Sequence, residues 1–126
     1  MENPRLYGHR PYVVVLVHGG PGAPGTMAPV ARELSAQWSV VEPLQTADSL
    51  EGQVRELRDA IAAHADPPVT LIGSSWGAML SFIVVARYPE LVRKLVLIGS
   101  GVFETPYAAG IDPERMRRLA PEDRLK

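Results

Sequence analysis

Four short apolar runs, each closely followed by glycine or proline, recur along the chain and limit how it can fold. They occupy residues 12–17, 39–42, 69–72 and 95–98. Continuous apolar runs of this length are typical of strands that are buried on both faces of a parallel sheet. The segments between the runs have apolar residues at helical spacing, so strands and helices alternate. This order predicts the α/β class: a mostly parallel sheet of about four strands, flanked by helices.

The three helices predicted between these strands differ in their apolar surface. The first covers about residues 27–34. The second begins at Asp48 or Ser49, either of which is a good N-cap, and its apolar residues recur at spacings of four, three and four. The third, residues 76–88, is apolar nearly all round, so we expect it to be buried.

The composition changes after the fourth predicted strand. Residues 103–126 contain three prolines, and residues 112–114 (DPE) are typical of a helix start. The helix that follows would be polar and would need another part of the protein to pack against. We therefore divide the chain into a core, residues 1–102, and a separate polar helical segment, residues 103–126.

Composition excludes several classes of function. The chain has 126 residues, which suits one domain, and it has no cysteine, so disulfides, thiolate catalysis and cysteine-bound zinc are excluded. A formal net charge of −1 gives no electrostatic footprint for nucleic acid or an anionic membrane. The N-terminus lacks the basic and apolar regions of a secretory signal. We therefore expect a cytoplasmic protein with no metal, no cofactor, and neither nucleic acid nor a membrane as a partner.

Residues 73–77 have the sequence GSSWG, which matches the pattern G-x-S-x-G with Ser75 at its centre. The match is specific because an apolar strand precedes it and an apolar helix follows it. A sharp turn between strand and helix strains the central residue, and small neighbours such as Gly73 and Gly77 keep the two backbones from colliding. The Ser75 hydroxyl then lies at the helix N-terminus, where the dipole favours negative charge. The alternative is that the glycines only permit close packing and that Ser75 is a helix cap.

A second candidate site, residues 18–22 (HGGPG), directly follows the first predicted strand. In a parallel sheet, this loop and the turn at Ser75 lie at the carboxyl ends of strands, where ligands bind. A backbone N–H of the loop and that of Trp76 can form an oxyanion hole, which stabilises the negatively charged oxygen of an acyl intermediate. We interpret His18 as a buried histidine that bonds to the backbone and shapes the loop; a catalytic role is the alternative.

The two motifs together resemble those of the α/β-hydrolase superfamily, and the pairing of HGGPG with GxSWG is most similar to the proline iminopeptidase group. The resemblance covers the N-terminal half of that fold. It implies that Ser75 is the nucleophile, that Gly20 and Trp76 are the oxyanion donors, and that residues 103–126 begin a lid. The structural residues of the two motifs would be His18, Gly19, Pro21, Gly22, Gly73 and Gly77.

The resemblance implies a serine hydrolase that forms an acyl-enzyme on Ser75 with a small-molecule ester, amide or related acyl substrate. The chain departs from the proline iminopeptidases after the second predicted strand. Residues 42–45 read EPLQ where those enzymes have a DQRG-type turn. We therefore expect an acyl substrate in general and not specifically a peptide.

The histidine that should activate the nucleophile does not appear where the resemblance requires it. In this fold the catalytic residues follow the order Ser, then Asp or Glu, then His, but His9, His18 and His64 all precede Ser75. Glu104 is the candidate acid, because some relatives of this fold place theirs a few residues after the corresponding strand. We therefore expect a truncated core that is poorly active alone. It would pair with a complementing C-terminal half or self-associate through an exposed sheet edge.

Two other functions fit parts of the sequence. Gly20, Gly22 and Gly25 match G-x-G-x-x-G, and Glu42 ends the next strand about 20 residues on, as in a dinucleotide-binding domain. Prolines within this loop remove N–H groups that would bind pyrophosphate, and this interpretation leaves residues 73–77 unexplained. The other alternative is a non-catalytic α/β-hydrolase-like module that binds a ligand or a partner.

Overall fold

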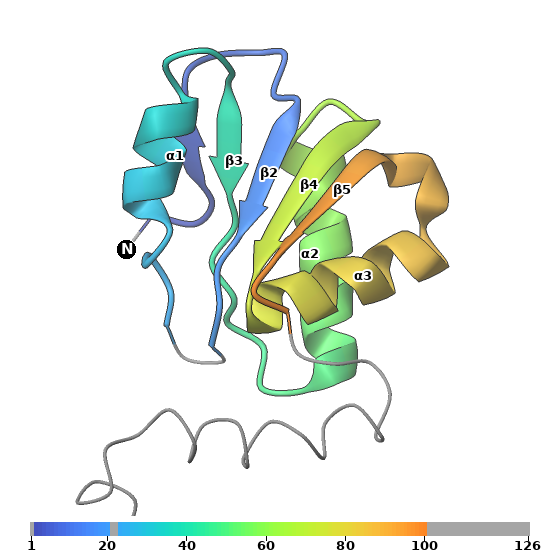
Figure 1. The fold of residues 1–126 in the computed structure, drawn as a ribbon. Helices are drawn as coiled ribbons and strands as arrows, with labels where there is room; N and C mark the ends of the chain where they lie inside the picture. Colours follow the sequence, from blue (N-terminus) through green and yellow to red (C-terminus); the bar gives the residue numbers. More distant parts are fainter. Residues whose placement is uncertain (1, 21–22, 101–126) are drawn as a thin grey trace, which may run out of the picture.

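The computed structural model describes residues 2–20 and 23–100, which contain five strands, three α-helices and one short 3₁₀ helix (Figure 1). In chain order, these elements are β1 (Arg5–Tyr7), β2 (Val14–Val17), α1 (Ala28–Leu34), β3 (Val40–Glu42), α2 (Leu50–His64), β4 (Val69–Ser74), α3 (Trp76–Arg87), η1 (Pro89–Leu91) and β5 (Val92–Ile98). All four predicted strands and all three predicted helices are present, with ends that differ by a few residues. Within the described part of the chain, no helix has the length and apolar character needed to cross a membrane.

The strands form one sheet in the order β1-β3-β2-β4-β5. β2, β3, β4 and β5 run parallel, which confirms the predicted α/β architecture, whereas β1 pairs antiparallel with β3. Sequence analysis missed β1. This strand has three residues and no apolar run of its own, and it is defined by pairing Arg5 with Glu42 and Tyr7 with Val40. Tertiary pairing, and not local pattern, makes it a strand.

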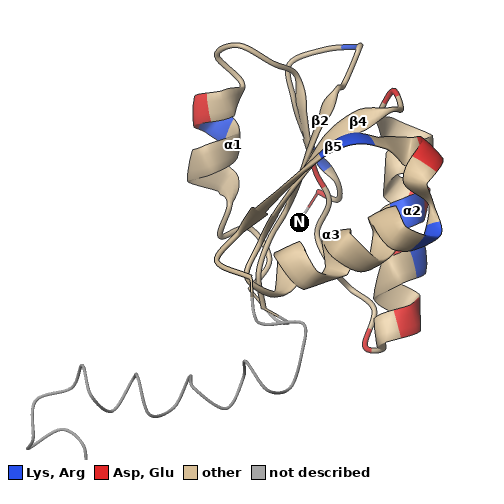
Figure 2. Cartoon of the chain, turned by 45° about the vertical axis from the view of Figure 1, so that its right-hand side comes forward, with Lys and Arg blue, Asp and Glu red and all other residues tan. Residues whose placement is uncertain are grey.

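Helices cover both faces of the sheet, but unequally. α1 lies on one face, whereas α2 and α3 lie on the other (Figures 1 and 2). The larger core lies beneath α2 and α3, and the smaller core lies beneath α1. The strands contribute to both cores because alternate side chains point to opposite faces. In β2, Val15 and Val17 belong to the larger core, and Val14 and Leu16 belong to the smaller one.

The expectation that α3 is buried nearly all round was wrong. The helix buries one side, formed by Gly77, Ala78, Leu80, Ser81 and Val84, while Phe82 is 44% exposed. The reason is its place in the fold: α3 packs against β4 and β5, and β5 is the last strand of the sheet. Strand β5 is itself partly exposed. An apolar helix at the margin of a sheet therefore buries only the side that meets the strands and the neighbouring helix α2.

A surface ion pair joins the start of α2 to the end of α3. Ser49, one of the two predicted caps, accepts a hydrogen bond from the Gly52 amide at 3.0 Å. In the same first turn, Glu51 accepts hydrogen bonds at both carboxylate oxygens from the guanidinium of Arg87 at the end of α3, at 2.7 and 2.8 Å. These hydrogen bonds hold the pKa of the Glu51 carboxyl below its usual value. The pair links the surfaces of the two helices, and because both side chains are exposed it contributes little to stability.

Candidate functional site

Two loops meet at the carboxyl edge of the sheet because their strands are neighbours. β2 and β4 pair in parallel, with Val17 opposite Gly73 near their ends. The loop after β2 therefore lies beside the turn after β4. A Cβ atom placed on Gly19 would lie 3.3 Å from the Cβ of Ser75 and 3.9 Å from its Oγ. The structure thus brings the glycine loop and the candidate nucleophile together.

Ser75 has a backbone conformation that is rare for a residue with a side chain. Its φ is 55° and its ψ is −118°, and no other non-glycine residue in the described ranges has a positive φ. Such strain costs about 1–3 kcal/mol and persists only where the surrounding structure enforces it. Here the Ser75 amide donates to the Ile98 carbonyl at 2.9 Å, which ties the turn to β5. Ser75 itself is exposed to solvent.

Gly73 and Gly77 bring β2, β4 and α3 closer together than side chains would allow. A Cβ atom on Gly77 would collide with the carbonyl groups of Val17 and His18, and would lie 2.9 Å from the Val17 carbonyl carbon. A Cβ atom on Gly73 would lie 2.6 Å from the Gly77 carbonyl carbon and 2.7 Å from the Ser81 Oγ. These contacts hold the first turn of α3 against the ends of both strands.

The first turn of α3 leaves a backbone amide available to a ligand. The amides of Ala78 and Met79 donate to the Ser75 carbonyl at 3.0 and 3.3 Å. Trp76 precedes them at the first helical position, where the amide has no intrahelical acceptor. On the neighbouring loop, Gly20 is exposed and has a φ of 132°, which favours glycine. A negative charge beside Ser75 would therefore meet the positive end of the α3 dipole.

His18 is fully buried, and both of its ring nitrogens bond to the main chain. Nδ1 lies 2.6 Å from the Gly19 carbonyl oxygen, and Nε2 accepts a hydrogen bond from the Gln45 amide at 2.9 Å. An imidazole that accepts at Nε2 carries its proton on Nδ1, so we assign the neutral tautomer that donates to Gly19. The ring thus holds the loop and has no nitrogen left to take a proton from Ser75.

The other two histidines lie at the opposite edge of the sheet. The His9 amide donates at 3.1 Å to the Oγ of Ser39, which directly precedes β3. His64 is the last residue of α2, from which the chain returns to the start of β4. Because parallel strands start at the same edge, both histidines are separated from the turn after β4 by the length of a strand.

Comparison with known proteins identifies the family. The sequence profile of the family described as the alpha/beta hydrolase fold matches residues 46–125, more than half of the chain. The chain belongs to the α/β-hydrolase family. The resemblance to this superfamily, drawn from the two glycine motifs, is thereby confirmed.

Relatives of this α/β-hydrolase have longer chains. Pyrrolizixenacetamide deacetylase of Xenorhabdus hominickii is 33% identical over 98 residues, which cover 69% of this chain and 37% of that protein. Homoserine O-acetyltransferase of Deinococcus radiodurans is 34% identical over 99 residues, covering 79% of this chain and 28% of that protein. The crystal structure of VinJ matches the fold with a TM-score of 0.81 at 23% identity, over 97% of this chain and 47% of that one. The chain thus spans less than half the length of each of these proteins.

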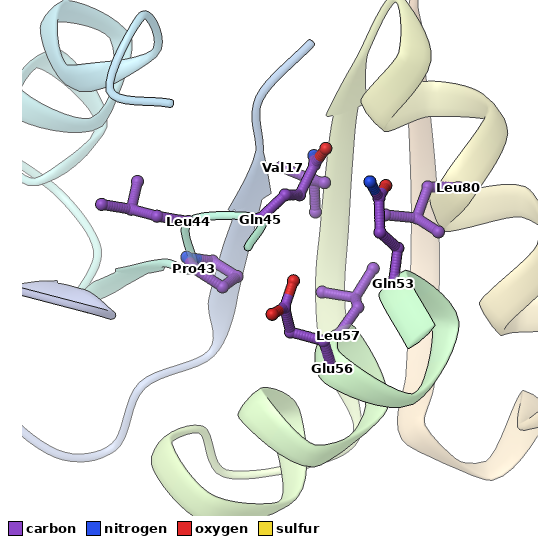
Figure 3. A pocket seen from close by; sticks show the side chains of 8 residues that line it. All are labelled: Val17, Pro43, Leu44, Gln45, Gln53, Glu56, Leu57 and Leu80. Carbon is purple, nitrogen blue, oxygen red and sulfur yellow. The ribbon is translucent and has the colours of Figure 1, made fainter. Parts of the chain in front are cut away.

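Two glutamines adjoin the site of this α/β-hydrolase, and sequence analysis did not identify them as site residues. Gln45 follows β3 and Gln53 lies in the first turn of α2; both line a cavity with room for about one water molecule (Figure 3). Gln45 donates to the His18 carbonyl at 2.8 Å, and Gln53 accepts from the Trp76 indole at 2.7 Å. The sequence did contain a signal for Gln53, because this residue lies at helical spacing from the other buried residues of α2.

Glu42, which the dinucleotide alternative assigns to a ribose, is fully buried at the end of β3. Its Oε1 accepts a hydrogen bond from the Tyr7 hydroxyl at 2.8 Å and lies 3.9 Å from a guanidinium nitrogen of Arg5. Burial and this hydrogen bond raise the pKa of the Tyr7 hydroxyl. A carboxylate enclosed by β1 is not presented to a ribose. The burial of Glu42 and the membership of the α/β-hydrolase family both argue against a dinucleotide-binding domain.

Some predicted site residues lie outside the described residues. They are Pro21 and Gly22 of the glycine loop, the candidate acid Glu104, and the segment 103–126 that was expected to begin a lid. Their placement stays a prediction. In residues 2–20 and 23–100, no group of three or more histidine and acidic side chains could hold a metal ion.

Proposed function

We propose that the chain is the nucleophile-bearing part of a serine hydrolase, which cleaves an ester, amide or related acyl substrate through an acyl-enzyme on Ser75. The observation that carries this proposal is the backbone of Ser75, whose positive φ holds an exposed residue at the start of α3 beside Gly19. Strained residues cluster at active sites because the strain places a reacting group. Membership of the α/β-hydrolase family supports the same chemistry.

In the proposed reaction, the Ser75 Oγ attacks the substrate carbonyl carbon while a general base takes the hydroxyl proton. The carbonyl oxygen becomes an oxyanion, which accepts hydrogen bonds from the amides of Gly20 and Trp76; one such donor contributes about 3–4 kcal/mol. Collapse of this intermediate breaks the bond to the alcohol or amine, which leaves with the proton held by the base. Water then attacks the acyl-enzyme through the same steps and releases the carboxylic acid.

The general base of this reaction is proposed to come from a segment outside residues 1–126. The ring of His18 is committed to the main chain, and His9 and His64 lie at the other edge of the sheet. Glu104 stays the candidate acid within the chain. The greater length of the relatives supports a second segment, since the chain spans 37% of the deacetylase and 47% of VinJ.

The edge strand β5 is proposed as the place where this complementing segment joins the sheet. In the described residues, β5 pairs with β4 and ends the sheet, and its Leu97 and Ile98 are 37% and 46% exposed. A strand edge with exposed apolar side chains favours the addition of another strand. Self-association of two copies through β5 is the alternative, but it would leave Ser75 without a base.

The relatives favour an acyl group as the part of the substrate that reaches Ser75. By their names, one removes an acetyl group and the other transfers one. The glycine loop resembles that of proline iminopeptidases, which would suggest a peptide. The EPLQ sequence after β3 departs from that group. We therefore retain a small-molecule acyl compound as the proposed substrate.

The isolated chain is expected to hydrolyse p-nitrophenyl acetate barely faster than buffer, because loss of the base costs about 10⁶ in turnover in a comparable triad. The measurement is p-nitrophenolate release by the unsubstituted chain and by Ser75→Ala. Fast turnover that Ser75→Ala abolishes would place the base within these 126 residues. That result would contradict the proposed second segment while supporting Ser75 as the nucleophile.

A non-catalytic binding module is the second candidate function. The engagement of both ring nitrogens of His18 favours it, because the one histidine beside the site cannot serve as a base. Such a module would use the same edge of the sheet to bind a ligand without reacting. The two candidates differ in whether the Ser75 hydroxyl forms a covalent bond with an electrophile.

A further inference from the structure

The two proposed oxyanion donors lie on different elements, so something must set the distance between them. Gly20 belongs to the loop after β2, whereas Trp76 begins α3. Residues 43–53, which connect β3 to the first turn of α2, contact both elements through the side chains of Gln45 and Gln53. Figure 3 shows these two side chains lining the same small cavity.

Gln45 holds the glycine loop through two hydrogen bonds to one residue. Its backbone amide donates to the His18 Nε2 at 2.9 Å, and its side-chain Nε2 donates to the His18 carbonyl at 2.8 Å. His18 in turn bonds to the Gly19 carbonyl. The Oε1 of Gln45 is buried and has no hydrogen-bond partner among the described residues.

Gln53 holds Trp76 in a comparable way. It is 6% exposed, its Oε1 accepts from the Trp76 indole Nε1 at 2.7 Å, and its Nε2 donates to the Ala47 carbonyl at 3.0 Å. The indole is therefore fixed to the same connection that holds the glycine loop. A neutral amide suits this position because it accepts from the indole and donates to a carbonyl at once.

We propose that Gln45 and Gln53 are positioning residues that fix the separation of the Gly20 and Trp76 amides. The inference rests on the proposed function, because it assigns those amides to the oxyanion. Neither glutamine touches the substrate in this scheme. Each acts through the residue that it holds: Gln45 through His18, and Gln53 through Trp76.

The variants that test this inference remove the side-chain hydrogen bonds of each glutamine, and one variant of Gln53 keeps the acceptor alone. Gln53→Leu removes both hydrogen bonds, whereas Gln53→Glu keeps an acceptor for the indole. Gln45→Leu removes the bond to the His18 carbonyl but keeps the backbone bond to its ring. Gln37→Leu, at an exposed glutamine just after α1, is the matched control.

The first readout is hydrogen exchange of the two tryptophan indoles, followed by nuclear magnetic resonance on the full chain. In Gln53→Leu the Trp76 indole should exchange at least about tenfold faster, because its acceptor is lost. Gln53→Glu should restore slow exchange. Trp38, which is 47% exposed, serves as an internal standard that should not change in any variant.

The second readout is the rate at which a fluorophosphonate labels Ser75 in imidazole buffer. Imidazole takes the hydroxyl proton, the Oγ–P bond forms, and fluoride leaves. Gln45→Leu and Gln53→Leu should label about 10- to 100-fold more slowly than the unsubstituted chain, since displacement by 1 Å costs up to about 100-fold. Gln53→Glu should recover most of the rate, and Gln37→Leu should match the unsubstituted chain.

The outcomes distinguish this inference from the proposed function. Equal labelling rates in the unsubstituted chain and in both leucine variants would overturn the positioning roles while leaving the proposed function intact. No labelling of Ser75 in the unsubstituted chain would overturn the proposed function and the inference together. Gln53→Glu could also restore slow exchange of the Trp76 indole and still label as slowly as Gln53→Leu. That result would overturn the role given to Gln53.

Discussion

Turnover of an activated ester should rise by up to about 10⁶-fold when a segment that carries the missing base joins residues 1–126, because that is the cost of removing the base from a comparable triad. A serine hydroxyl is a weak nucleophile at neutral pH until an adjacent base takes its proton. In the described residues the histidine beside Ser75 has both ring nitrogens bonded to the main chain. The strained turn alone therefore places the proposed nucleophile without activating it.

The measurement compares p-nitrophenyl acetate hydrolysis by the isolated chain with hydrolysis by the chain extended into its following coding sequence, or mixed with the product of an adjacent gene. The gain should vanish in the extended Ser75→Ala protein and when the histidine supplied by the new segment is replaced by alanine. A downstream segment that joins β5 and yet leaves turnover unchanged would contradict the proposed enzyme. It would favour the binding module.

Replacement of Gly77 by alanine should destabilise the chain by about 3 kcal/mol, even though alanine is the better helix former by about 1 kcal/mol. The added Cβ would meet two main-chain carbonyl groups at the end of β2, belonging to Val17 and His18, and neither can rotate away as a side chain could. Either the strand or the helix must move. Because Gly77 lies in the first turn of α3, that movement would also displace Ser75.

The check is urea unfolding of Gly77→Ala, with Gly99→Ala as its control. Gly99 has a φ of 56°, but a Cβ atom there would meet nothing within 4 Å. Its replacement should therefore cost about 1–2 kcal/mol, the penalty for a left-handed alanine alone. A Gly77→Ala chain that is no less stable than Gly99→Ala would contradict the close approach of α3 to β2.

Most of the fold could be predicted because its strands and helices are encoded locally. The apolar runs that became β2 and β4 are nearly continuous, and buried parallel strands have that pattern. The parallel order follows from alternation with helices. Strand β1 carries no such signal, since Arg5–Tyr7 becomes a strand only by pairing with β3. Helical periodicity likewise does not report that α3 lies at the margin of the described sheet, where one side of the helix stays exposed.

The candidate site was predictable where one stretch of sequence fixes the geometry. Strand, turn and helix are contiguous around Ser75, so the backbone strain could be expected from residues 73–77 alone. The supporting contacts could not be expected, because each joins residues that are distant in sequence. Gln45 bonds to His18 across 27 positions, and Gln53 bonds to Trp76 across 23.

Covalent labelling of Ser75 tests the central claim most directly. The chain is incubated with a fluorophosphonate in imidazole buffer, and the modified residue is identified by peptide mass spectrometry. We predict one adduct, on Ser75, which is lost in Ser75→Ala and retained in Ser74→Ala, because the strained backbone presents only the middle residue of the turn. An adduct on Ser74 or on another residue, or no adduct in a chain that is shown to be folded, would contradict the claim.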